Sequence, residues 1–185
     1  MRRRLRHGLG VGLAAVVAVV AIPNSAYALG AGSSTLWKNY SNSNLCMGVA
    51  GGNSKVQDGA AIVTWTCNGS ADQTWVLADS NPDQPDGTYL IENSVSTSEC
   101  LSVGAKSTSP NARVVLWHCK PASDNQDQRW YLTTDRQAPY NYLQNFNSGL
   151  VATELYTVFN VGLGAPVAQE SQNPTAYPFD AWVSA

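Results

Sequence analysis

The pentapeptide ADQTW at residues 71–75 returns almost unchanged as QDQRW at residues 126–130, and a shorter form, FDAW, stands at residues 179–182. The tryptophans of these segments, Trp75, Trp130 and Trp182, are separated by 55 and 52 residues. Repetition at a nearly constant interval indicates one structural unit built several times. These segments therefore indicate a chain made of three copies of one unit.

Cysteine and asparagine residues follow the same interval. Cys46 and Cys100 are separated by 54 residues, and Cys67 and Cys119 by 52. The asparagines of KNY, ENS and QNF also repeat after 54 and 52 residues, at Asn39, Asn93 and Asn145. Because independent markers share one period, the sequence predicts copies at about residues 33–80, 81–134 and 135–185.

Each copy is composed of short segments typical of β-strands. In the first copy these are TLWKNY, LCMGV, AAIVTWTC and TWVLA, which are separated by turn sequences such as GGNSKVQDG. The second copy repeats the pattern with TYLIEN, CLSV, ARVVLWHC and RWYLTT. No segment after residue 28 has an apolar helical period of useful length. We therefore expect an all-β protein of about twelve strands, four in each copy.

Twelve short strands need an arrangement that hides their edges, because exposed edge strands pair with other chains. Closing three four-strand units into a threefold barrel hides these edges. The sequence thus predicts a β-trefoil of three pseudo-equivalent lobes. Trp75, Trp130 and Trp182 are expected at the same core position of each lobe.

The N-terminus has the features of a signal peptide. MRRRLR is cationic, an unbroken apolar run of 12 residues covers 11–22, and Ala26-Tyr27-Ala28 matches the small-x-small pattern of a signal peptidase site. The apolar run is shorter than the roughly 20 residues that span a bilayer, although an uncleaved anchor is the alternative. We expect residues 1–28 to be removed and residues 29–185 to form a single extracellular domain.

The expected mature chain is acidic. Four of the 11 basic residues precede residue 29, which leaves 7 basic against 13 acidic residues, a difference of −6. No cluster of Lys or Arg follows Arg6, which disfavours nucleic acid and anionic membrane surfaces as partners. Abundant small polar residues and six tryptophans suit a surface that binds through hydrogen bonds and aromatic faces. We expect it to be a monomer.

Four cysteines in an exported chain indicate disulfides. Three pairings are open, and local pairing is favoured because the spacings within the copies are nearly equal, at 21 residues for Cys46 with Cys67 and 19 for Cys100 with Cys119. Zinc is the competing interpretation. It is disfavoured because no two cysteines are closely spaced and His118 is the only mature histidine. We expect no metal and no cofactor.

The first two copies resemble a known repeat. They read CMGV…DGAAIVTWTC…DQTW and CLSV…NARVVLWHC…DQRW, which is similar to the repeat of the ricin B-type lectin trefoils with its Q-x-W signature. This family includes carbohydrate-binding modules of secreted bacterial glycosidases. The third copy departs from the pattern, with Gly149 and Gln172 at the expected cysteine positions and Asp180 in place of the signature glutamine.

The resemblance implies a shallow sugar pocket on a lobe. In the family an aromatic ring two residues before the second cysteine stacks on the sugar, and this position holds Trp65, Trp117 and Glu170 in the three copies. An aromatic face suits the weakly positive C–H face of a pyranose. The first two copies therefore carry the expected ring.

The resemblance also implies polar contacts next to the signature glutamine. In the family an asparagine at this position donates to a sugar hydroxyl group, whereas this chain has Asp72 beside Gln73 in the first copy and Asp127 beside Gln128 in the second. We expect the two glutamines to orient their neighbours through hydrogen bonds more than to contact the sugar directly. The family's main acceptor, an aspartate two residues after the first cysteine, is replaced by Gly48, Ser102 and Val151. As a hypothesis, Asp58 or Asp72 supplies an acceptor from a different direction.

Catalytic motifs are missing from the sequence. No motif marks a pair of glycosidase carboxylates, no Gly-x-Ser-x-Gly accompanies His118, and no phosphate-binding glycine loop is present. We expect a lectin-like protein, not an enzyme, that binds a polysaccharide or other glycan, with the first lobe as the best candidate. Two alternatives stay open. One is a protein-binding or inhibitory trefoil that uses the loops at 78–87 or 172–178, and the other is a trefoil that has lost sugar binding.

Overall fold

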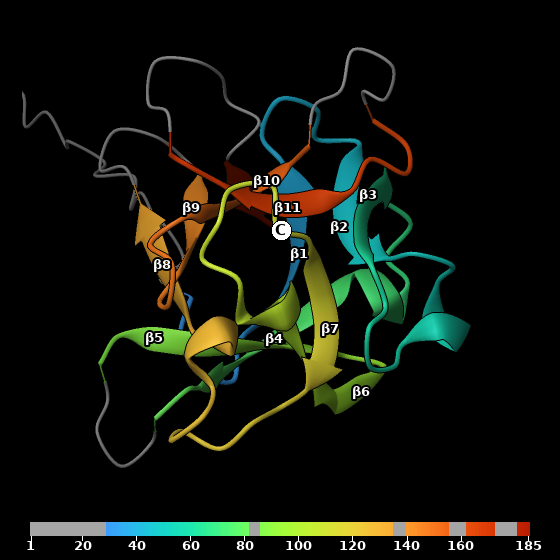
Figure 1. Cartoon of the computed structure of the whole chain (residues 1–185). Coiled ribbons are helices and arrows are strands. Elements are labelled where there is room, and N and C mark those ends of the chain that lie inside the picture. The colour runs from blue at the N-terminus through green and yellow to red at the C-terminus, as the bar shows by residue number, and fades with distance from the viewer. Residues whose placement is uncertain (1–28, 82–85, 135–139, 156–161, 173–180) are drawn as a thin grey trace, which may run out of the picture.

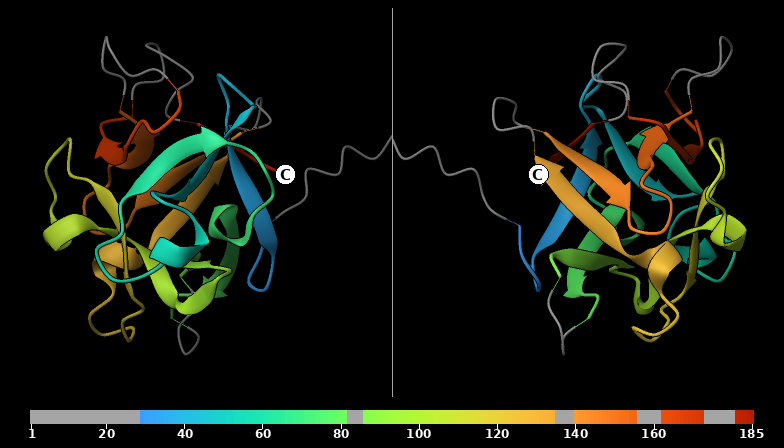
Figure 2. Two further views of the ribbon diagram at one scale, coloured as in Figure 1. Left: turned by 90° about the vertical axis from the view of Figure 1, so that its right-hand side faces the viewer. Right: turned by 60° about the vertical axis from the view of Figure 1, so that its left-hand side comes forward.

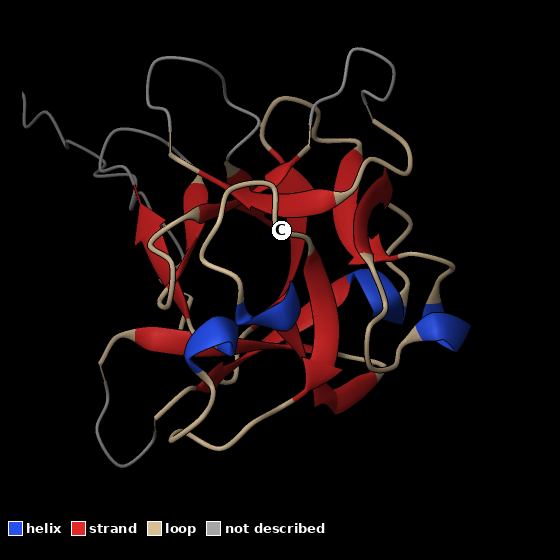
Figure 3. Ribbon diagram, viewed as in Figure 1, coloured by secondary structure: helices blue, strands red, loops and turns tan. Residues whose placement is uncertain are grey.

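The computed structural model describes residues 29–81, 86–134, 140–155, 162–172 and 181–185. These residues form strands and four 3-10 helices of three residues each (Figure 3). The strands are β1 (Ser34–Asn39), β2 (Leu45–Val49), β3 (Ile62–Thr66), β4 (Thr74–Asp79), β5 (Thr88–Asn93), β6 (Ser96–Val103), β7 (Val114–His118), β8 (Trp130–Thr134), β9 (Asn141–Asn145), β10 (Val151–Glu154), β11 (Val167–Glu170) and β12 (Trp182–Ser184). The helices are η1 (Asn53–Lys55), η2 (Ala71–Gln73), η3 (Gly104–Lys106) and η4 (Gln126–Gln128).

Six of the strands close into a ring. Backbone pairing runs from β1 through β4, β5, β8, β9 and β12 and returns to β1 (Figure 1). The other strands form the hairpins β2–β3, β6–β7 and β10–β11, which the two turned views in Figure 2 show from other sides. Isolated bridges join the hairpins at Ala61↔Val115, Val63↔Pro166 and Arg113↔Ala168. This arrangement confirms the predicted β-trefoil.

The three repeated tryptophans occupy equivalent core positions. Each indole is fully buried, and each Nε1 donates to a backbone carbonyl in the first strand of its lobe's hairpin. The donor–acceptor distances are 3.1 Å for Trp75 to Met47, 2.9 Å for Trp130 to Leu101 and 2.9 Å for Trp182 to Ala152. The buried indole N–H groups are thus satisfied, and the threefold repeat predicted from the sequence is confirmed in the core.

These bonds correct the predicted alignment of the third lobe. Met47 and Leu101 each follow a cysteine directly, so Val151, which precedes Ala152, occupies the cysteine position. Strand register agrees, because Val151 pairs with Glu170 as Cys46 pairs with Trp65. The sequence-based placement of Gly149 at this position was therefore wrong.

The physical reason is a shorter turn before β10. The repeated asparagine precedes the cysteine position by seven residues in the first two lobes but by six in the third, where Asn145 precedes Val151. Gly149 lies inside that turn, with φ of +70° and its N–H donating to the Asn145 carbonyl. The position of the family's aspartate is consequently Thr153 in this lobe and not Val151.

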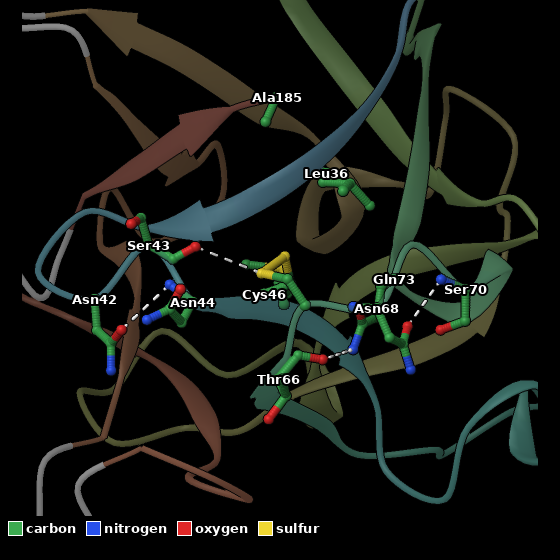
Figure 4. Close-up of a disulfide and its surroundings, with 12 residues drawn as sticks. Leu36, Asn42, Ser43, Asn44, Cys46, Thr66, Asn68, Ser70, Gln73 and Ala185 are labelled. Atoms are coloured by element: carbon green, nitrogen blue, oxygen red, sulfur yellow. Dashed lines mark hydrogen bonds between the residues drawn. A yellow bond between two sulfur atoms is a disulfide. The ribbon is translucent and has the colours of Figure 1, made fainter.

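The two predicted disulfides are confirmed. Cys46 is bonded to Cys67, with a Cα–Cα distance of 4.9 Å (Figure 4). Cys100 is bonded to Cys119, with a Cα–Cα distance of 5.0 Å. No cysteine is free, so the thiolates that a zinc site would need are not present. Each bridge ties the start of a hairpin to the segment just after it.

The expected signal peptide, residues 1–28, lies outside the described residues. Within the described ranges, no helix has the length and apolar character to cross a membrane. The expected partner loops at 78–87 and 172–178 fall partly outside the described residues, which exclude 82–85 and 173–178.

Candidate functional site

A pocket of about 490 Å³ opens on the first lobe. It lies between the β2–β3 hairpin and η2, and its lining includes Val49, Trp65, Asn68, Asp72, Gln73 and Gly164. Gly164 comes from the third lobe, so the pocket is built across a lobe boundary. Three of the residues predicted from the sequence, Trp65, Asp72 and Gln73, are thus brought together here.

The ring of Trp65 is held at the pocket but is not buried. It projects from β3 with 49% of its surface exposed. A Cβ placed on Gly164 would lie 3.5 Å from its Cζ3 atom, and Gly164 has φ of +79°, a conformation that glycine adopts readily. A side chain at Gly164 would therefore contact one edge of the indole, and glycine leaves this edge free. A large exposed ring of this kind is suited to stacking on a ligand.

Asp72 occupies the space next to the position of the missing family aspartate. A Cβ on Gly48 would lie 3.3 Å from Asp72 Oδ2 and 2.9 Å from Gln73 Cγ. The exposed fraction of Asp72 is 6%. The absence of a side chain at Gly48 therefore makes room for a carboxylate that reaches the pocket from η2.

Local hydrogen bonds fix the orientation of Asp72. Its N–H donates to Asn53 Oδ1 at 2.8 Å, and Ser70 Oγ donates to its Oδ1 at 2.6 Å. Among the described residues, its Oδ2 has no hydrogen-bond donor. A carboxylate oxygen without a protein donor can accept a hydrogen bond from a ligand hydroxyl group.

The signature glutamines connect backbone segments. Gln73 Nε2 donates to the Thr66 carbonyl at 2.9 Å, and its Oε1 accepts from the Asn68 N–H at 3.0 Å (Figure 4). Gln128 makes the same bonds, to the His118 carbonyl at 2.9 Å and from the Lys120 N–H at 2.8 Å. Each glutamine therefore ties the 3-10 helix that carries the aspartate to the backbone on both sides of the second cysteine.

The second lobe carries an equivalent but smaller pocket of about 290 Å³, lined by Ser102, Lys106, Trp117, Lys120 and Asp127 among others. Trp117 is 44% exposed, and a Cβ on Gly59 of the first lobe would lie 3.9 Å from its Cζ3. The structure thus brings together Trp117, Asp127 and Gln128, as it does their counterparts in the first lobe.

The carboxylate of the second pocket is already paired. Lys120 Nζ donates to Asp127 Oδ1 at 3.0 Å and Oδ2 at 2.9 Å, and Ser102 Oγ donates to Oδ2 at 2.8 Å. Sequence analysis missed Lys120. The available signal was the residue after the second cysteine of each copy, which is Asn68 in the first and Lys120 in the second.

Comparison with known proteins gives the family. The profile of the ricin-type β-trefoil lectin domain matches residues 34–155. The chain belongs to this family. The match covers the first two lobes and the start of the third, and the closed barrel shows that the lectin fold continues to β12.

Solved structures share the lectin fold. The designed threefold symmetric protein ThreeFoil has a TM-score of 0.69 at 22% identity, over 82% of this chain and 97% of that chain. The ricin B-like lectin of Macrolepiota procera, solved with lactose, has a TM-score of 0.63 at 13% identity, over 84% of this chain and 96% of that chain. An exo-β-1,3-galactanase of Clostridium thermocellum has a TM-score of 0.66 at 20% identity, but this chain covers only 30% of the galactanase chain. A search of curated protein sequences found no match.

The third lobe of the lectin domain has a different group at the ring position. Glu170 Oε1 accepts a hydrogen bond from the Asn111 N–H of the second lobe at 2.9 Å. Asp180, predicted at the signature position, lies outside the described residues. At this position of β11 the third lobe therefore has a carboxylate in place of an aromatic ring.

Asp58, the other hypothetical acceptor, forms a hydrogen bond across a lobe boundary. Its Oδ1 accepts from the His118 N–H at 2.5 Å, and it is not among the residues that line the first pocket. Burial raises the pKa of nearby Glu99, and the negative charge of Asp58 raises it further. Asp72 is consequently the better acceptor candidate.

A metal site receives no support in the part of the chain that the structure describes. The cluster of metal-ligating residue types there combines Glu92 with Cys100 and Cys119. The two cysteines are joined in a disulfide, so neither offers the thiolate that a metal binds.

Proposed function

We propose that the chain is a secreted, non-catalytic lectin that binds glycan in the pocket of the first lobe. The observation that carries this proposal is the meeting of a half-exposed indole, Trp65, with the carboxylate of Asp72 in one open pocket. A pyranose offers an apolar face and adjacent hydroxyl groups, which these two side chains complement.

Each pocket residue has a separate role in this proposal. Trp65 stacks on the sugar ring, Asp72 Oδ2 accepts from a hydroxyl group, and the side-chain amide of Asn68 donates to another. Gln73 does not contact the sugar, because its amide group already bonds two backbone segments. It keeps η2, and therefore Asp72, in place.

Two further findings support glycan binding outside the cell. The chain belongs to the ricin-type β-trefoil lectin family, and a structural neighbour was solved with lactose. Two disulfides are typical of an oxidising compartment. The galactanase neighbour, of which this fold covers a minor part, is compatible with a lectin that acts beside an enzyme.

Retention on immobilised glycans tests the proposal. The mature chain is passed over xylan, galactose-terminated glycans, chitin and cellulose, and the variants Trp65→Ala and Asp72→Asn are compared on the glycan that retains it. We expect both variants to lose retention while keeping the wild-type near-ultraviolet circular dichroism. Trp117→Ala is the matched control, because it removes the same ring from the second lobe. Full retention of a folded Trp65→Ala variant would refute the proposal.

A further inference from the structure

The pockets of the first two lobes differ most at one position. Asn68 and Lys120 each follow the second cysteine of their lobe, and the backbone N–H of each donates to the signature glutamine, at 3.0 and 2.8 Å. The two side chains therefore start from the same place. Within the described ranges no cation pairs with the first carboxylate, whereas Lys120 pairs with the second.

The Lys120–Asp127 pair is shielded from solvent. The exposed fraction of the side chain is 18% for Lys120 and 2% for Asp127, and both carboxylate oxygens accept from the ammonium group. With Ser102 also donating, Asp127 has three hydrogen bonds from protein donors. Asp72 has a single side-chain donor, Ser70, on its carboxylate.

We propose that Lys120 determines which lobe binds glycan, by pairing with Asp127 and so closing the second pocket to sugar hydroxyl groups. This inference rests on the proposed function of the pockets. A hydroxyl group that bonds Asp127 has to displace an ammonium group, which leaves two poorly solvated charges without their partners. The first pocket carries no such cost. The chain then has one open site and one closed site.

The rim of the second pocket supports the same conclusion. Gly51 and Gly52, with φ of +87° and +76°, follow β2, and the corresponding residues after β6 are Ala105 and Lys106, with φ of +54° and +55°. Residues with side chains rarely adopt this conformation. Lys106 is a second lysine in the lining of this pocket, with its ammonium group paired to Asp124. The pocket volume is about 290 Å³, compared with 490 Å³ in the first lobe.

Exchanging the two residues tests the inference. Lys120→Asn installs the residue of the first lobe, and Lys120→Arg is the control that keeps the cation. The probes are lactose, xylotriose, chitotriose and cellotriose, and the readout is the indole N–H signals of Trp65 and Trp117 in two-dimensional NMR spectra. We expect Lys120→Asn to bind at least one probe at Trp117 with roughly tenfold or greater gain in affinity. Lys120→Arg should remain without this response.

The reverse exchange covers the case in which Lys120→Asn does not fold. Asn68→Lys changes an exposed residue and should weaken binding at Trp65 by roughly tenfold or more. A folded Lys120→Asn variant without any gain at Trp117, or an Asn68→Lys variant that binds like wild type at Trp65, would overturn the inference. If wild type binds no probe but Lys120→Asn gains binding at Trp117, the role of Lys120 holds and the proposed function of the first lobe fails.

Discussion

The indole N–H of Trp182 donates to the carbonyl of Ala152 at 2.9 Å, which is the bond that Trp75 makes to Met47 in the first lobe. The third lobe keeps this bond although it has neither a disulfide nor the aromatic ring of the pocket. The residues that build the core of the trefoil thus differ from those that we propose to bind glycan. A lobe can lack the disulfide and the tryptophan at the ring position and still complete the barrel.

Truncation of a repeated core tryptophan should strongly destabilise the folded protein. Trp75→Ala removes a fully buried indole and should lower the free energy of unfolding by roughly 3–5 kcal/mol. Urea denaturation measures this change. Trp65→Ala is the control, because its ring is half exposed, and it should change stability far less. An unaltered melting temperature for Trp75→Ala would show that the core is assigned incorrectly.

The third lobe should open before the other two. The disulfides close loops in the first two lobes with sequence separations of 21 and 19 residues, and each should add about 3 kcal/mol by restricting the unfolded chain. No disulfide restrains the third lobe, because all four cysteines lie in the other two. Native-state hydrogen exchange should therefore show the fastest opening in β10 and β11. Greater protection there than in β2 and β3 would contradict this expectation.

Glu154 should make stability depend on pH. Burial raises the pKa of Glu154 above its ordinary value of 4.5, although the hydrogen bond that its carboxylate accepts from the Gly162 N–H at 2.9 Å lowers this pKa. A carboxyl whose pKa is raised by folding contributes stability at low pH, and this contribution is lost as the pH rises through the folded-state pKa.

The variant Glu154→Gln separates this effect from other titrations. Glutamine has nearly the shape of a protonated glutamic acid but does not titrate, so the variant lacks the contribution of Glu154 to the pH dependence of stability. The free energy of unfolding of wild type should then fall more steeply than that of Glu154→Gln as the pH rises above 4.5. Parallel profiles in urea denaturation series would disprove the assignment.

Gly48 should be required for both packing and binding. A Cβ at Gly48 would lie 2.9 Å from Gln73 Cγ and 3.3 Å from Asp72 Oδ2. Gly48→Ala should therefore destabilise the fold by roughly 1–3 kcal/mol and weaken glycan retention by displacing Asp72. Gly30→Ala is the matched control, because a Cβ there meets no atom within 4 Å. Wild-type retention by Gly48→Ala would show that Asp72 does not contact the sugar.

The features that repeat along the chain could be predicted from the sequence. One period shared by tryptophans, cysteines and asparagines gave the three lobes, and the nearly equal cysteine spacings gave the pairing of Cys46 with Cys67 that the structure confirms. The third lobe was misaligned because its turn before Val151 is one residue shorter, and neither cysteine remains to mark the position.

Contacts between side chains that are distant in sequence were harder to predict. The pairing of Lys120 with Asp127 depends on how the end of β7 and η4 meet across the signature glutamine. The position of Gly164 beside Trp65 depends on a bridge between two hairpins. Such contacts are set by the closure of the barrel, and the residues involved have no distinctive motif of their own.

The crystal structure of the complex with the best-retained oligosaccharide tests the central claim most directly. We expect one sugar ring stacked on the indole of Trp65, with a hydroxyl group within hydrogen-bond distance of Asp72 Oδ2 and the second pocket still closed by Lys120. A sugar bound at Trp117, or bound on the first lobe without contact to Trp65 and Asp72, would contradict the account.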